Sequence, residues 1–230
     1  MQPTKEGKIS VSVMCSDLMN LERDIKQLER NGVDYLHVDV MDAHFVPNLT
    51  FGVDFIAAMH RVTKLPLDIH LMVEHPLPIM EAMDIRPGDR ISLHVELGEQ
   101  LHELAKAIRA RGAHFGLVVN PSTPVEALTP YLDEIEWVIL MLVQPGFAGA
   151  KLIDGILDKV AAARRPVPLD GHGVGLLGDF CAQLGRRAKR GADVLAVLDI
   201  RDMAGALRQC GAQHRTVRCA FTGGHRGRSA

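Results

Sequence analysis

Two short apolar segments of the chain carry histidine and aspartate at every second position, which is the spacing of side chains on one face of a β-strand. In the first segment His37 and Asp39 share a face. In the second segment Asp68 and His70 share a face, and a third apolar run ends at Asp170. Because an unpaired charge inside an apolar strand is costly, these five side chains are candidates for chemistry rather than for packing.

Imidazole nitrogens and carboxylate oxygens together suit a divalent metal such as Zn, Fe, Mn or Co. One His-x-Asp pair alone is more often structural, but two imidazoles and two carboxylates at matched strand ends favour a metal site. His94 and Glu96 share a face of a further expected strand. The favoured interpretation of that pair is hydrogen-bonded support of the site or of the core, and a direct part in the site is the alternative.

Glycine-containing loops follow two expected strands, at residues 144–149 and 171–173. Such turns expose backbone N–H groups that can hold a phosphate. Four methionines also fall near strand ends: Met14, Met41, Met72 and Met141. Core packing is the commoner reason for methionine, and lining of a binding site at the strand ends is the alternative.

The elements that must position these residues are short runs rich in Val, Ile and Leu, which alternate with amphipathic stretches. Eight runs are expected as strands: residues 9–14, 35–41, 67–72, 91–95, 114–119, 137–143, 167–169 and 193–200. Helical patterns include 17–31, between a Ser16/Asp17 cap and Gly32, and 100–111, before Gly112. Strands that are apolar on both faces and alternate with helices predict a parallel sheet. Eight units of roughly 25–30 residues predict an α/β fold of the (β/α)8 TIM-barrel type. A doubly wound open sheet is the alternative, but no early strand is followed by Gly-x-Gly-x-x-Gly.

Composition limits the class of protein. Of the 230 residues 47% are apolar and 23% are charged, with a net charge of −2, which excludes a disordered or strongly basic nucleic-acid-binding chain. No apolar run reaches the roughly 18 residues of a membrane span. We expect one barrel domain over residues 1–205, with an irregular C-terminal third, and a basic, flexible tail over residues 206–230. The polar start and four cysteines without a Cys-x-x-Cys pair favour a cytoplasmic protein.

Five segments of the chain together resemble the ribulose-phosphate 3-epimerase family, including its allulose-6-phosphate 3-epimerase relatives. They are residues 10–17, 37–48, 67–73, 117–124 and 143–149, and the resemblance covers residues 8–160. It implies a metal-dependent TIM barrel of the ribulose-phosphate-binding type that inverts the carbinol next to the carbonyl of a ketose phosphate. The implied reaction converts D-ribulose 5-phosphate to D-xylulose 5-phosphate, in a homo-oligomer without membrane or nucleic-acid partners. Conversion of D-allulose 6-phosphate to D-fructose 6-phosphate is the alternative.

The resemblance also implies roles for individual residues. His37, Asp39, His70 and Asp170 would bind one divalent metal, with Zn2+ as the first expectation and Fe2+, Mn2+ or Co2+ as alternatives. Asp39 and Asp170 would be the acid/base pair on opposite faces of an ene-diolate. Contacts to the substrate would come from Ser12, Met41, His70, Met72, Met141, Gly146, Phe147, Ala148, Gly149 and Gly171.

The chain departs from the family pattern at several positions. Ala43 stands where glycine is usual, and Ala148 stands in the strand-six loop where glycine is commoner. A histidine, His172, is inserted after Gly171. The Gly-Ser phosphate contact of the family aligns with Leu198-Asp199, which would add negative charge beside a phosphate.

These departures leave a second function open, namely a catalytically weak metal- or sugar-binding paralogue. Related sugar-phosphate decarboxylases and aldolases are disfavoured, because they carry Asp-x-Lys where this chain has Asp68-Ile69-His70. Nucleic-acid binding through the arginine-rich tail is disfavoured as well.

Overall fold

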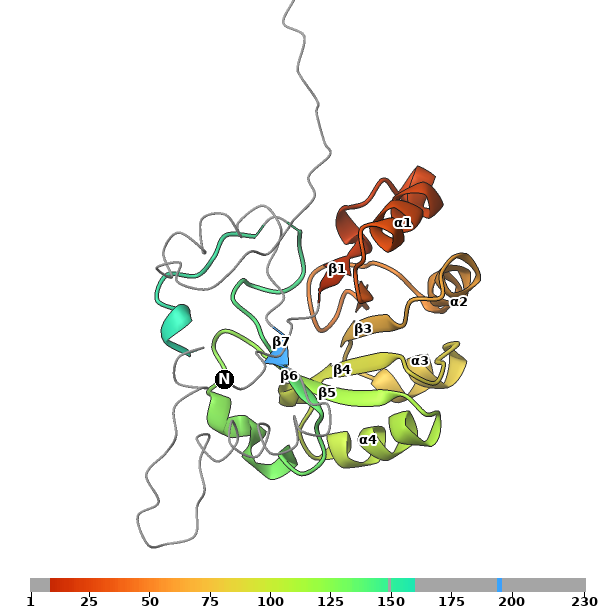
Figure 1. Cartoon of the computed structure of the whole chain (residues 1–230). Helices are drawn as coiled ribbons and strands as arrows, with labels where there is room; N and C mark the ends of the chain where they lie inside the picture. Colours follow the sequence, from red (N-terminus) through yellow and green to blue (C-terminus); the bar gives the residue numbers. More distant parts are fainter. Residues whose placement is uncertain (1–8, 149, 160–193, 196–230) are drawn as a thin grey trace, which may run out of the picture.

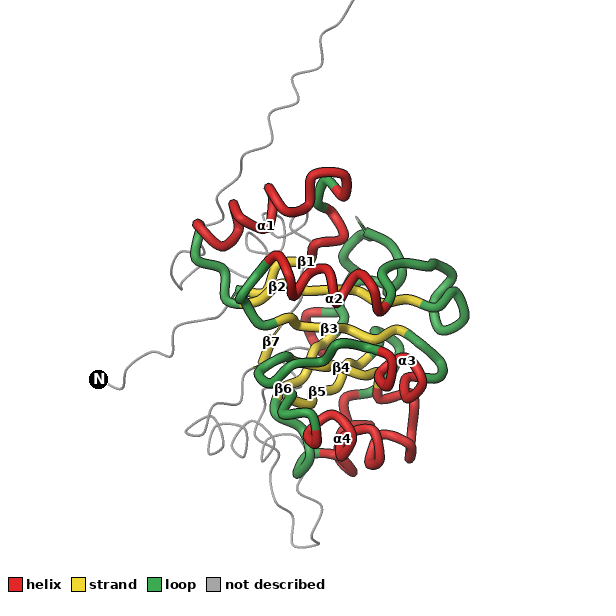
Figure 2. The backbone as a smooth tube through the Cα atoms, turned by 90° about the vertical axis from the view of Figure 1, so that its right-hand side faces the viewer, coloured by secondary structure: helices red, strands yellow, loops and turns green. Residues whose placement is uncertain are grey.

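The computed structural model of the chain describes residues 9–148, 150–159 and 194–195. Seven strands within these residues form one sheet in which each strand pairs in parallel with the next. They are β1 (Ser10–Ser12), β2 (Tyr35–Met41), β3 (Leu67–Met72), β4 (Arg90–His94), β5 (His114–Val119), β6 (Trp137–Leu140) and β7 (Val194–Leu195). Figure 2 shows β1 to β3 above β4 to β6, as this order requires.

Helices connect the consecutive strands from β1 to β6. The α-helices are α1 (Leu21–Arg30), α2 (Val53–Val62), α3 (Pro76–Ala82) and α4 (Leu101–Ala110), and the 3-10 helices are η1 (Val13–Cys15), η2 (Leu18–Asn20), η3 (Val95–Gln100) and η4 (Val125–Tyr131). All four α-helices lie on the same side of the sheet (Figure 1). Parallel strands joined by helices are the arrangement that the alternating sequence pattern predicts, and α-helices on one side are typical of a barrel rather than of the doubly wound alternative.

The two faces of the sheet carry different residues because side chains alternate along each strand. One face carries only apolar side chains and packs against the helices, so that Val38, Ile69 and Leu117 lie in the largest apolar cluster with Ile56 and Leu104. The other face carries the polar residues of β2, β3 and β4. The sheet therefore separates a packing face from a chemical face.

Local signals place the ends of the helices. Asp17 caps η2 by accepting a hydrogen bond from the Met19 N–H, so the helix expected from residue 17 begins as a 3-10 turn and continues as α1. Gly32 and Gly112 follow α1 and α4 with φ of 75° each, a conformation that costs glycine little and other residues more. Both stop signals in the sequence are confirmed.

Strand bounds follow the apolar runs closely. The expected segments 35–41, 67–72 and 114–119 match β2, β3 and β5 residue for residue. The segment 167–169 lies outside the described residues. Of the segment 193–200, Val194–Leu195 is described, and it pairs directly with β6, which is the place expected for the strand at 167–169. The parallel β/α sheet is thus confirmed, and the complete eight-strand barrel stays a prediction.

The expected tail at 206–230 also lies outside the described residues. Among the described helices none is long and apolar enough to cross a bilayer.

At β5 and β6 a tryptophan side chain packs on the chemical face of the sheet, over a glycine. Gly116 and Trp137 are register partners on β5 and β6, and a Cβ built on Gly116 would lie 2.3 Å from Cε2 of Trp137. The guanidinium of Arg90 lies between the rings of Tyr35 and Trp137, at 4.7 and 4.2 Å from their centroids. Only glycine at position 116 leaves room for the indole beside this cation.

Candidate functional site

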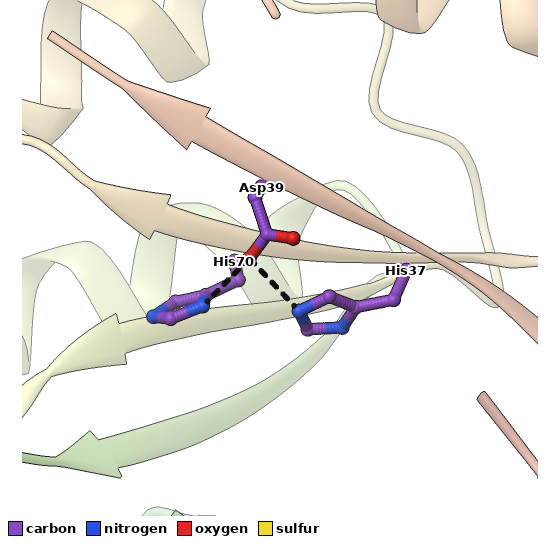
Figure 3. A group of neighbouring side chains, drawn as sticks. All are labelled: His37, Asp39 and His70. Carbon is purple, nitrogen blue, oxygen red and sulfur yellow. Dashed lines mark hydrogen bonds and ion pairs between the residues drawn. The ribbon is translucent and has the colours of Figure 1, made fainter. Parts of the chain in front are cut away.

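Three side chains from two neighbouring strands converge on the chemical face of the sheet (Figure 3). His37 and Asp39 come from β2 and His70 from β3, and one ligand atom from each lies within 4.8 Å of the others. Oδ1 of Asp39 lies 3.2 Å from Nε2 of His37 and 3.2 Å from Nδ1 of His70. All three residues are buried, so water competes little for these nitrogen and oxygen atoms.

The strand register brings these residues together. His37 pairs with Asp68 and Asp39 pairs with His70 across the β2–β3 ladder. Because side chains alternate along a strand, all four point to the same face. The face shared by the two residues of each His/Asp pattern is therefore confirmed, and the register shows that both pairs lie on the same side of the sheet.

The charges around His37 and Asp39 favour a bound cation. Burial alone would lower the pKa of His37, but the carboxylates of Asp39 and Asp68 outweigh it and raise this pKa to about 10. Burial alone would raise the pKa of Asp39, but His37 and His70 hold it well below its usual range. Two carboxylates enclosed with imidazoles require a positive charge beside them, which a proton or a metal ion can supply.

Two serines of β1 orient the carboxylates. Ser10 donates from Oγ to Oδ2 of Asp68 at 2.7 Å, and that oxygen also accepts from Nδ1 of His37 at 2.9 Å. Ser12 donates from Oγ to Oδ2 of Asp39 at 2.9 Å. The sequence interpretation singled out Ser12 but missed Ser10, although its position two residues before Ser12 puts both on one face.

A second polar chain leads away from His70 through β4. Nε2 of His70 lies 2.8 Å from Nε2 of His94, and Nδ1 of His94 donates to Oε2 of Glu96 at 3.3 Å. Glu96 also accepts from the Asn120 N–H at 3.2 Å and from the Thr123 hydroxyl. Burial lowers the pKa of His94 to about 4. Burial opposes ionisation of Glu96, but its hydrogen bonds from His94 and Thr123 lower its pKa to about 2.

The methionines divide into two groups. Met41 and Met72 are register partners, each two residues beyond Asp39 and His70 on the same face. They pack with Val46 at the carboxyl ends of their strands. Met14 also packs against this group. Met141 belongs to a separate cluster around Trp137. The structure thus brings Met41 and Met72 beside the His/Asp cluster, whereas Met141 packs in the other cluster.

A cavity of about 520 Å³ lies at the carboxyl ends of the strands. Its lining residues come from the loops after β2, β4, β5 and β6: Phe45, Val46, Pro47, Glu96, Asn120, Gln144, Pro145, Phe147 and Ala150. The carbonyl of Gly146 accepts a hydrogen bond from Nδ2 of Asn48 at 2.6 Å, which ties the loop after β6 to the loop after β2. Gly146 has a φ of 117°, and an added Cβ would lie 3.4 Å from Val46, so glycine suits this position.

The remaining predicted site residues fall on or beyond this loop. Phe147 lines the cavity and is more than half exposed, and Ala148 is exposed. Gly149, Asp170 and Gly171 lie outside the described residues.

The donor set suits a divalent metal ion. Two imidazole nitrogens and one carboxylate oxygen form a mixed N/O set of the kind that zinc, iron, manganese and cobalt accept. The second nitrogen of His37 already donates to a carboxylate, as metal-bound histidines usually do. The residues present therefore fit the group that the resemblance implies.

A parallel β/α repeat with a buried His/Asp cluster near the carboxyl ends of its strands is the arrangement of a β/α protein whose candidate site lies at those ends. A profile of the "Ribulose-phosphate 3 epimerase family" matches residues 8–179. The chain belongs to this family, whose curated members are carbohydrate epimerases of the isomerase class.

Three curated relatives illustrate the similarity. The chain is 40% identical over 158 residues to "Ribulose-phosphate 3-epimerase" of Bacillus subtilis (strain 168), covering 69% of this chain and 73% of that protein. It is 42% identical over 147 residues to the protein of the same name from Rhodobacter capsulatus, covering 64% of each. It is 37% identical over 166 residues to "Ribulose-phosphate 3-epimerase, cytoplasmic isoform" of Oryza sativa subsp. japonica, covering 70% of this chain and 73% of that protein.

Proposed function

We propose that the chain is a metal-dependent epimerase that inverts C3 of D-ribulose 5-phosphate to give D-xylulose 5-phosphate. The observation that carries this proposal is the buried cluster of His37, Asp39 and His70. Membership of the epimerase family supports the reaction class. D-allulose 6-phosphate, which would give D-fructose 6-phosphate, is the second candidate substrate.

The proposed metal ligands are Nε2 of His37, Oδ1 of Asp39 and Nδ1 of His70, because these atoms converge. Asp170 is proposed as the fourth ligand, from the resemblance alone. Zn2+ is the first choice, with Fe2+, Mn2+ or Co2+ as alternatives. A divalent cation bound there would supply the positive charge that stabilises an ene-diolate, by several kcal/mol.

Epimerisation needs an acid/base group on each face of a flat intermediate. A proton next to a ketone is far less acidic than a carboxylic acid, so it must be removed by a base held in contact with it. Asp39 is proposed as one of these groups, because Ser12 fixes the carboxylate through Oδ2. Asp170 is proposed as the group on the opposite face. Met41 and Met72 would pack against the intermediate without offering it a proton.

The phosphate is proposed to bind at the loop after β6. Gly146, Phe147, Ala148 and Gly149 would present backbone N–H groups there, together with Gly171. The adjacent cavity of about 520 Å³ is within the usual size range of small-ligand sites. Ser12 and His70 are proposed to contact the sugar, and Met141 is proposed as a further contact residue from the resemblance alone.

The wider architecture is proposed to follow the family. Residues 1–205 would complete a (β/α)8 barrel, and residues 206–230 would form a separate basic tail. We further propose a cytoplasmic homo-oligomer.

The test is proton exchange at C3. Metal-loaded protein is incubated with ribulose 5-phosphate in heavy water, and deuterium at C3 is measured by NMR. We expect exchange by the wild type and a loss of roughly 10²- to 10⁴-fold for Asp39→Asn. Asp54→Asn, which changes an exposed aspartate on α2, should exchange at the wild-type rate. Absence of exchange with Zn2+, Fe2+, Mn2+ and Co2+ would refute the proposal.

Two further comparisons separate the alternatives. Parallel turnover of ribulose 5-phosphate and allulose 6-phosphate orders the substrates, and we expect the five-carbon sugar to react faster. A catalytically weak paralogue is the alternative function, because by resemblance Leu198-Asp199 aligns with the Gly-Ser phosphate contact of the family. Tight phosphate binding that is unchanged in Asp199→Ser would remove the main support for that candidate.

A further inference from the structure

His94 is a buried polar residue and Glu96 is a more exposed one, and the proposed mechanism uses neither. His94 has no exposed surface, and Glu96 stands at the edge of the cavity with 26% of its side chain exposed. They form one line of contacts with His70, in which each ring nitrogen has one polar neighbour. A line of this kind fixes where protons lie and how the rings are turned.

The partners assign the tautomers along this line. A carboxylate only accepts hydrogen bonds, so Nδ1 of His94 carries a hydrogen that it donates to Glu96. The lone pair of His94 is then at Nε2 and accepts from Nε2 of His70 at 2.8 Å. With its hydrogen at Nε2, His70 has a lone pair at Nδ1, 3.2 Å from Oδ1 of Asp39, and two acceptors this close need a cation beside them, which a bound metal would supply.

We infer that His94 and Glu96 are positioning residues that hold His70 in the tautomer and ring orientation needed to bind the metal through Nδ1. This inference rests on the proposed function, because it concerns the same metal site. His37 has the equivalent support more directly, since its Nδ1 donates to Asp68. A carboxylate therefore orients each proposed imidazole ligand. Asp68 orients His37 directly, and Glu96 orients His70 through the imidazole of His94.

Packing and hydrogen bonds hold this line rigid. The rings of His70 and His94 meet edge to edge at their Nε2 atoms, with centroids 4.9 Å apart and planes 24° apart, and the centroid of the Phe45 ring lies 4.6 Å from that of His94. Glu96 is fixed in turn by Thr123 and by the backbone N–H of Asn120.

The chain offers a closely matched control. Glu136 also accepts from Nδ1 of a histidine, His114 at 2.6 Å, and from one backbone N–H, that of Phe115 at 3.3 Å. His114 is half exposed and stands at the start of β5, at the opposite end of the strand from the cavity. Glu136→Ala therefore removes the same kind of bonds without touching the line that leads to His70.

The experiment measures Zn2+ affinity by competition with a chromogenic chelator, on wild type and on Glu96→Ala, Glu96→Gln, Glu136→Ala and His94→Phe. We expect Glu96→Ala and His94→Phe to weaken Zn2+ binding by about 10- to 100-fold. Glu96→Gln should weaken it less, because the amide oxygen still accepts from His94. Glu136→Ala should leave it unchanged. Unfolding of each metal-free variant in urea separates these effects from a loss of folding.

The outcomes separate this inference from the proposed function. If wild type and Glu96→Ala bind Zn2+ equally well, the positioning role is refuted even when C3 exchange is normal. If Glu96→Ala and Glu136→Ala weaken binding equally, the effect is general and the inference also fails. Wild-type protein that binds Zn2+ but shows no C3 exchange contradicts the proposed reaction, while the ranking of the Glu96 variants still decides the positioning role.

Discussion

Replacing Gly116 by alanine should destabilise the sheet beneath the candidate site. The added Cβ would lie 2.3, 2.6 and 2.7 Å from Cε2, Cδ2 and Nε1 of Trp137, whereas carbon atoms in contact are about 3.5–4.0 Å apart. The indole is only 1% exposed and has the Arg90 guanidinium 4.2 Å from its centroid, so it has little room to move by about 1 Å. We expect a loss near the upper end of the overpacking range, about 3 kcal/mol.

Urea unfolding followed by far-UV circular dichroism measures this loss, and in a chain of this size it corresponds to a fall in Tm of about 6–12 °C. Trp137 is the only tryptophan, so its fluorescence also reports the displaced ring directly. Gly52→Ala is the control, because its added Cβ meets nothing within 4 Å and its φ of −118° suits any residue; as the N-cap of α2 it should lose no more than about 1 kcal/mol.

A double-mutant cycle tests the cause. In a Trp137→Leu background the clash is absent, so Gly116→Ala should cost less than about 1 kcal/mol there. Equal losses in both backgrounds, or a Gly116→Ala protein within about 0.5 kcal/mol of wild type, would show that the indole does not need this space.

Two more perturbations test the loop after β2. Ala43 has a φ of 62°, so Ala43→Gly should relieve strain and raise the unfolding free energy by about 0.5–1 kcal/mol, net of the entropy that glycine adds to the unfolded chain; a lower Tm would contradict this. Asp42 accepts from the N–H groups of His44, Phe45 and Glu74 at 2.8 Å each, so Asp42→Ala should cost about 1–3 kcal/mol at neutral pH. Burial opposes ionisation of Asp42, but these three bonds lower its pKa. The stabilisation by the Asp42 carboxylate is therefore complete above about pH 4 and is lost as the pH falls through the folded-state pKa. The urea midpoints of Asp42→Ala and of the wild type should converge in acid. A constant difference between them would refute the argument.

Strand positions were the part of the fold that could be predicted best. Buried parallel strands are continuous apolar runs, so β2, β3 and β5 could be delimited to the residue. The run 137–143 was expected to be one strand, but β6 ends at Leu140, because hydrophobicity continues into the cluster around Met141 while the ladder stops. Apolar patterning reports burial and does not show where strand pairing ends.

The three clustered His and Asp residues could be predicted from the sequence, but the residues that hydrogen-bond around them could not. Alternation put His37 and Asp39 on one face of their strand, and the register with β3 placed His70 beside them. The roles of Ser10 and Thr123 depend on residues more than 20 positions away in the sequence, Asp68 and Glu96 respectively. Spacing within one segment carries no information on such partners, which is why His94 and Glu96 received a general interpretation as support.

The central claim is that His37, Asp39 and His70 hold one divalent cation. Its most direct test is metal analysis after equilibrium dialysis against Zn2+, combined with X-ray absorption at the zinc edge. We predict one Zn2+ per wild-type chain with imidazole nitrogens at about 2.0–2.1 Å, greatly reduced retention in His70→Gln, and wild-type retention in His44→Gln, which changes an exposed histidine. Wild-type protein that retains no zinc, or His70→Gln protein that retains as much as wild type, would contradict the claim.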